Sequence, residues 1–92
     1  MASSKTFNGV TPTIWECVKA TSFKEHETVY APAGANQGTA TTNTLVGLVV
    51  LGYDYNPSTG NVTYTVEKKP FIVSASQIWD GIQETIDGCS GK

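Results

Sequence analysis

The 92-residue chain contains no arginine and few charged residues of any kind. Its six basic residues are all lysines, charged side chains make up only 15% of the sequence, and the formal net charge is −2. Arginine is the residue best suited to bidentate phosphate binding, and the lysines stand apart except at Lys68 and Lys69. We therefore predict that the protein does not bind nucleic acid.

Long apolar segments are also missing. No apolar run approaches the roughly 20 residues that span a bilayer, and the first ten residues, MASSKTFNGV, lack the apolar core of a signal peptide. The sequence therefore predicts no membrane span. It leaves the compartment open, because the protein is cytoplasmic if Met1 is the native start and secreted if a signal peptide has been removed.

Motifs for catalysis or for cofactor binding are absent as well. The chain contains neither a G-x-S-x-G nucleophile motif nor a phosphate-binding loop. His26, the only histidine, stands between Glu25 and Glu27, but neighbours on a strand point to opposite faces and do not converge on one metal ion. We therefore expect no catalytic residue, no metal and no cofactor, and we place a small enzyme third among the functions considered.

The two cysteines, Cys17 and Cys89, lie near opposite ends of the chain. In an oxidising compartment they would form one disulfide, and closing so long a loop would stabilise the fold by about 4 kcal/mol in the chain-entropy model. In a reducing compartment they would remain free thiols and pack as small apolar side chains. The sequence alone favours neither state.

The segment LVGLVVLGYDYNPSTGNVTYTV, from Leu45 to Val66, predicts a β-hairpin. Pro57 and Gly60 suit the two ends of a four-residue loop, and that loop fixes which residues face each other across the hairpin. In the resulting register, apolar residues of both strands share one face, which we interpret as the core face. They are Val49, Leu51, Tyr53 and Tyr55 of the first strand and Val62, Tyr64 and Val66 of the second.

The opposite face of this hairpin would carry Val46, Leu48 and Val50 beside threonines of the second strand. An apolar stripe of this kind needs a cover from another segment, a second subunit or a ligand. We interpret it as a binding surface for a second copy and expect a homo-oligomer. Tyr53 and Tyr55 are weaker candidates for stacking a planar ligand such as a sugar, since aromatic residues at core spacing are usually core.

Helix signals frame the hairpin on both sides. Ser74 and Gln77 have capping-box spacing, Gly88 suits a C-terminal cap, and an apolar stripe lies between them, so residues 75–88 predict an amphipathic helix. Thr11 followed by Pro12 is typical of a helix start. The sequence therefore predicts a second helix over residues 12–22. A strand is the alternative, because the segment is rich in residues that favour strands.

Together these patterns predict an α+β fold in a single compact domain, 1–92, in which residues 1–9 are a flexible N-terminus. An antiparallel meander of about three strands, roughly 27–32, 39–55 and 61–69, would stand between the two helices. The preferred function is a non-enzymatic binding or interaction module that self-associates through a sheet face. The alternative is a small secreted, disulfide-stapled domain such as a carbohydrate binder, an inhibitor or a toxin. Both leave room for a small-molecule or carbohydrate ligand.

Overall fold

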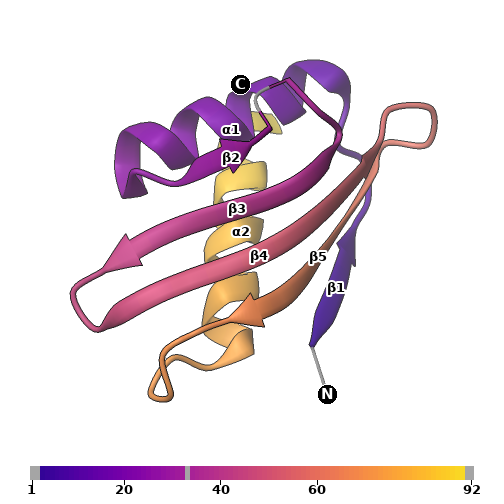
Figure 1. Ribbon diagram of the computed structural model, residues 1–92. Coiled ribbons are helices and arrows are strands. Elements are labelled where there is room, and N and C mark those ends of the chain that lie inside the picture. The colour runs from indigo at the N-terminus through magenta and orange to yellow at the C-terminus, as the bar shows by residue number, and fades with distance from the viewer. Residues whose placement is uncertain (1–2, 33, 91–92) are drawn as a thin grey trace.

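A computed structural model describes residues 3–32 and 34–90, and these form an α+β fold, as predicted (Figure 1). The elements in chain order are β1 (Ser4–Phe7), α1 (Pro12–His26), β2 (Val29–Ala31), β3 (Gln37–Thr44), β4 (Gly47–Asn56), β5 (Asn61–Lys68) and α2 (Ala75–Ser90). The strands make one antiparallel sheet in the order β1-β5-β4-β3-β2. Both helices pack on one face of this sheet, and we call the other face the open face.

Helix α1 carries the chain from one edge of the sheet to the other, because β1 and β2 are the two edge strands. A helix of 15 residues rises about 22 Å. Four steps between neighbouring strands amount to about 19 Å, so α1 is long enough to cross the sheet. Strands β2 to β5 then follow as a meander that returns to pair with β1.

The β4–β5 hairpin has the predicted register. Tyr55 pairs with Val62 and Tyr53 pairs with Tyr64. Gly60 ends the connecting loop with a φ of 77°, a conformation that disfavours residues with a Cβ, and its N–H donates to a backbone carbonyl of β4. The residues predicted to face the core are buried or half-buried on the face that the helices cover.

The meander has more strands than predicted, because residues 39–55 belong to two strands instead of one. A turn at Leu45 and Val46 separates β3 from β4, and Gly47 follows it with a φ of 137°. The Thr44 hydroxyl fixes this turn, since it donates to the Gly47 carbonyl at 2.6 Å and accepts from the Val46 N–H at 3.2 Å. This turn lacks the Asn-Gly or Pro residues by which short hairpins are usually identified, and it lies within an apolar run. The sequence therefore reads as one continuous strand at this point.

Part of the segment 1–9, which the sequence predicts to be flexible, forms a strand in the described residues. Ser4–Phe7 form the edge strand β1, which pairs with β5. Phe7 is 3% exposed and its ring meets the Tyr64 ring edge-on. The hydroxyl oxygens of Thr6 and Thr63 lie 2.8 Å apart across the two strands. A partner almost sixty residues away in sequence orders this strand, and no local pattern indicates it.

Both helices begin where the sequence predicts. The Thr11 side chain accepts a hydrogen bond at the start of α1, and Ser74 and Gln77 form the capping box of α2. The ends lie further along, because α1 extends to His26 and α2 continues through Gly88, which was predicted to cap it. Neither helix within the described residues is long and apolar enough to cross a membrane.

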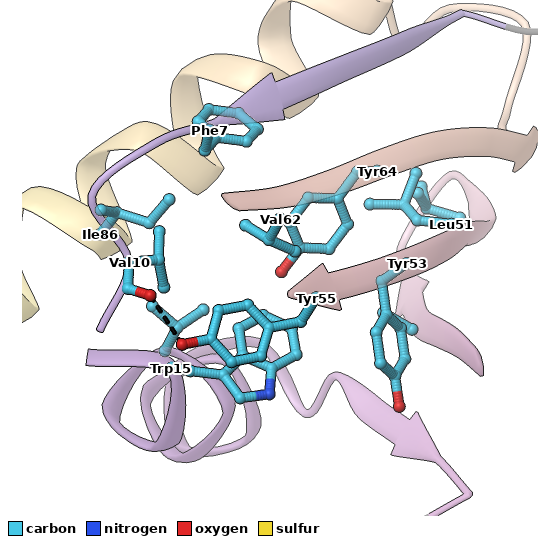
Figure 2. Packing of buried hydrophobic residues seen from close by; sticks show 12 residues of the cluster. Phe7, Val10, Trp15, Leu51, Tyr53, Tyr55, Val62, Tyr64 and Ile86 are labelled. Atoms are coloured by element: carbon cyan, nitrogen blue, oxygen red, sulfur yellow. Dashed lines mark hydrogen bonds between the residues drawn. The ribbon is translucent and has the colours of Figure 1, made fainter. Parts of the chain in front are cut away.

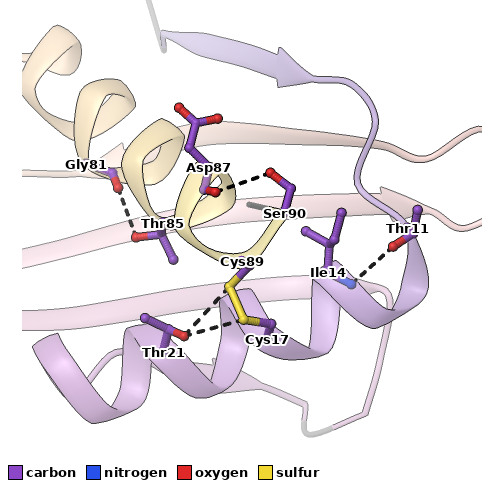
Figure 3. The surroundings of a disulfide bond; sticks show 9 residues. All are labelled: Thr11, Ile14, Cys17, Thr21, Gly81, Thr85, Asp87, Cys89 and Ser90. Atoms are coloured by element: carbon purple, nitrogen blue, oxygen red, sulfur yellow. Dashed lines mark hydrogen bonds between the residues drawn. A yellow bond between two sulfur atoms is a disulfide. The ribbon is translucent and has the colours of Figure 1, made fainter. Parts of the chain in front are cut away.

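A disulfide joins Cys17 of α1 to Cys89 of α2 (Figure 3). The two cysteines are 72 residues apart in sequence, and their Cα atoms lie 5.9 Å from each other. The Thr21 hydroxyl lies 3.7 Å from both sulfur atoms. The bond fixes the last turn of α2 against the middle of α1, so the disulfide is the alternative that the fold adopts.

Candidate ligand cavity

The core is solid where α1 crosses β4 and β5, because large aromatic side chains fill this part (Figure 2). Trp15 stacks on Tyr55 with ring centroids 4.7 Å apart, and the rings of Tyr30 and Tyr53 each lie 5.6 Å from it. The Tyr55 hydroxyl donates to the Val10 carbonyl at 2.7 Å. These residues hold α1 on the sheet and leave no room for a ligand between them.

The core is hollow beside this aromatic cluster. A cavity of about 380 Å³ lies between the two helices and the sheet. The core face of β3 presents only small side chains to it, and α2 contributes Gly81 and Thr85 to its wall. Because interiors are otherwise close-packed, small side chains on facing walls leave unfilled volume. The lining is mainly apolar and includes Val18, Ala40, Val46, Val49, Leu51, Val73, Ile78 and Ile82.

Hydroxyl groups gather where α1 ends and β2 begins. Ser22 and Thr28, which line the cavity, are 9% and 8% exposed. The Thr28 hydroxyl oxygen lies 2.6 Å from that of Thr42 on β3. One hydrogen bond between these two hydroxyls uses only one of their two protons, so the pair keeps a donor for a ligand. His26, at the end of α1, is exposed beside them at the rim of the cavity.

Two other hydroxyl groups of the wall and the side-chain carbonyl of Gln77 already have hydrogen-bond partners. The Thr44 hydroxyl donates to the Gly47 carbonyl, and the Thr85 hydroxyl donates to the Gly81 carbonyl at 3.0 Å. The side-chain carbonyl of Gln77 accepts from a backbone N–H in the α2 cap. The Ser22 side chain hydrogen-bonds to Tyr30, so a polar group buried in the cavity would find its hydrogen-bond partner at Thr28 and Thr42.

Tyr30 lies between the cavity and the aromatic cluster. Its hydroxyl oxygen is 2.8 Å from that of Tyr64. Burial raises the pKa of Tyr30, although hydrogen bonds from the side chains of Tyr64 and Ser22 oppose this, and burial raises the pKa of Tyr64 still further. Both phenols therefore stay neutral at neutral pH. Among the described residues that line the cavity there is no carboxylate and no lysine.

The residues that the sequence suggested for binding do not come together. Tyr53 and Tyr55 are 4% and 3% exposed and belong to the aromatic cluster. Leu48 and Val50 are half-buried on the open face. Val46 does not share that face with them as predicted; it lines the cavity, because the turn at Leu45 and Val46 interrupts the alternation of faces.

Sequence reasoning missed the cavity and its hydroxyl groups at Ser22, Thr28 and Thr42. One signal was present in QGTATTNT (37–44), where every second residue from Gly38 onward is small, and three of these residues line the cavity: Ala40, Thr42 and Thr44. Small residues on a core face indicate space. That interpretation needs β3 to be recognised as a separate strand, which the missed turn prevented.

No protein-family model matches the chain, and no curated protein or solved structure matches it either. Among residues 3–32 and 34–90 there is also no cluster of His, Cys, Asp and Glu side chains suited to a metal ion. The fold and the cavity themselves therefore define the class, a small disulfide-bonded α+β domain whose core is hollow at one end.

Proposed function

We propose that the protein is a non-enzymatic binding module that holds one small apolar molecule between its sheet and its two helices. The observation that carries this proposal is the cavity of about 380 Å³. Ligand pockets are typically roughly 300–1,000 Å³, mostly apolar, with a few polar groups that fix orientation. The cavity has each of these properties. Apolar ligand surface buried there would contribute about 25 cal/mol per Å².

The lining indicates the chemistry of the ligand. A cavity of about 150 Å³ holds benzene, so by proportion this cavity suits about ten to fifteen heavy atoms. A charged group inside the cavity would lose its hydration without gaining a counter-ion there, because the described lining has no lysine or carboxylate and its one histidine, His26, is exposed at the rim. One hydroxyl or carbonyl group could bond to the pair Thr28 and Thr42. An uncharged aliphatic alcohol or ketone of this size fits the site best.

Gly81→Leu is expected to abolish ligand binding while stabilising the fold. Gly81 forms part of the cavity wall, and a Cβ added there meets no atom within 4 Å. A leucine side chain would occupy ligand volume, and it should raise the free energy of unfolding by up to about 1 kcal/mol because glycine is a poor helix former. Fluorescence titration with 1-naphthylamine, an uncharged dye within the size range of the cavity, followed by displacement with decanol, measures binding, and urea unfolding measures stability.

Gly88→Leu is the matched control. Gly88 lies in the same helix and also has no atom within 4 Å of an added Cβ, but it does not line the cavity. This variant should gain similar stability and keep the affinity of the wild-type protein for the dye. The proposal fails if the wild-type protein does not bind the dye, or if both variants bind it equally well.

Self-association through the open face is a second candidate function. Val29 and Val50 both pair with Thr41, one from each side, and Leu48 lies two residues before Val50. Val29 is 52% exposed. Helix α1 packs on the opposite face of the sheet, so it does not supply the cover that this apolar stripe lacks. A second copy of the chain, related by a two-fold axis, would place its own apolar stripe against this one, so that each copy covers the stripe of the other.

Leu48→Glu is expected to convert a dimer at micromolar concentration into a monomer with unchanged helix content, because it puts a charge at the centre of the stripe. Sedimentation velocity measures the mass, and circular dichroism measures the helix content. Ser58→Glu, which puts the same charge in the exposed β4–β5 loop, should leave the dimer intact. A wild-type protein that sediments as a monomer would contradict this second function.

A further inference from the structure

Two loops at one end of the molecule expose large apolar side chains, and we call this surface the apolar tip. It consists of Leu45 and Val46 in the β3–β4 turn and of Phe71 and Ile72 in the loop between β5 and α2 (Figure 1, lower left). Leu45 is 107% exposed, Phe71 is 99% exposed and Ile72 is 71% exposed. The loops are neighbours, because the Pro70 ring lies 3.1 Å from the place that a Cβ on Gly47 would occupy.

Positive charge borders the apolar tip. Lys68 and Lys69 directly precede Pro70 and are exposed. Among the described residues, the salt bridge in the structure joins Lys19 to Glu16. Lys68 and Lys69 therefore have no salt-bridge partner in that part of the chain. The Glu67 carboxylate lies over Gly52 in the middle of β4, and the first turn of α2 contains no acidic residue.

The apolar tip is continuous with the ligand cavity. Val46 belongs to the tip and lines the cavity, and Val73, the residue after Ile72, lines it as well. The two loops that make the tip therefore also form part of the rim of the cavity. A surface that covered the tip would lie against that rim.

We propose that the apolar tip docks on a lipid bilayer that displays anionic headgroups. Leu45 and Phe71 would leave water for the boundary of the acyl chains, while Lys68 and Lys69 would bind the headgroups. A lipid surface satisfies both features at once. A second copy of the chain suits them less well, because a two-fold contact at the tip would bring two lysine pairs together. The proposal does not depend on the cavity being occupied.

Co-sedimentation with vesicles tests this proposal directly. The full chain should bind vesicles made of equal parts phosphatidylcholine and phosphatidylserine, and it should bind vesicles of phosphatidylcholine alone more weakly. Lys68→Gln combined with Lys69→Gln should weaken binding to the mixed vesicles by about thirtyfold, since each lysine near an anionic surface contributes attraction. Lys5→Gln combined with Lys24→Gln removes the same charge elsewhere and should change binding much less.

Phe71→Ser should weaken vesicle binding by at least about tenfold, because a buried aromatic ring contributes that much or more. Phe71 is fully exposed, so the variant should keep the unfolding midpoint of the wild-type protein. Phe23→Ser is the matched control, since Phe23 is 61% exposed on α1, outside the tip, and this change should leave vesicle binding within twofold.

Three results would overturn the docking proposal: no binding to the mixed vesicles, equal losses for Phe71→Ser and Phe23→Ser, or dimerisation without vesicles that Phe71→Ser abolishes. The last result would assign the tip to a second copy of the chain. Binding of 1-naphthylamine without vesicles is a separate measurement, so the docking proposal and the cavity proposal can fail independently.

Discussion

A chain that ends after Ser74 is expected to show no cooperative unfolding transition. Helix α2 buries Ile86, and three further apolar residues of the helix pack against the core. These side chains contribute on the order of 1–2 kcal/mol each, and the loss of Cys89 removes a disulfide that contributes about 4 kcal/mol. The sum is comparable to the whole stability of a small domain, about 5–15 kcal/mol. Thermal melting followed by circular dichroism measures the transition.

The truncated chain should also carry Cys17→Ser, so that a free thiol does not link two molecules. A chain ending at Ser90, which keeps the whole of α2 and the disulfide, is the control and should melt like the full-length protein. A sharp melting transition in the chain ending at Ser74 would show that the sheet and α1 fold by themselves, and it would contradict this assignment of α2.

Loss of the disulfide alone is expected to lower the free energy of unfolding by about 4 kcal/mol. The reason is that Cys17 and Cys89 are 72 residues apart, so the bond greatly restricts the unfolded chain. The variant Cys17→Ala combined with Cys89→Ala isolates this effect, because it removes the bond and keeps the apolar residues of α2. Urea unfolding of both proteins under identical conditions measures the difference.

Reduction of the wild-type protein is the control for that variant. Wild-type protein in excess dithiothreitol should unfold at nearly the same urea concentration as the double variant, because both lack the bond. If reduction left the wild-type midpoint unchanged, the cross-link would have no effect on the stability of the fold.

Local signals in the sequence identified the parts of the fold that depend on near neighbours. The loop between Pro57 and Gly60 fixed the register of β4 and β5, and the capping box at Ser74 and Gln77 placed the start of α2. Such signals involve residues within a few positions of each other. The register in turn identified which face of the hairpin is buried, since side chains alternate along a strand.

These local signals could not predict contacts between segments that are far apart in the sequence. Ser4–Phe7 is a strand only because β5 lies beside it. The sequence left the state of Cys17 and Cys89 open, because their pairing requires α1 and α2 to lie together. The turn at Leu45 and Val46 was missed for a different reason: its residues are apolar and resemble the strands around them.

The sequence by itself therefore determined the α+β class, the start of α2 and the buried face of the β4–β5 hairpin, and it favoured a helix from Pro12 with a strand as the alternative. Only the tertiary structure decided the cavity and the apolar tip. A cavity is volume that side chains from several elements do not fill, so Thr42 on β3 and Gly81 on α2 both line it only because the fold brings the two elements around the same space. The tip likewise exists because two separate loops, at Leu45 and at Phe71, meet at one end of the sheet.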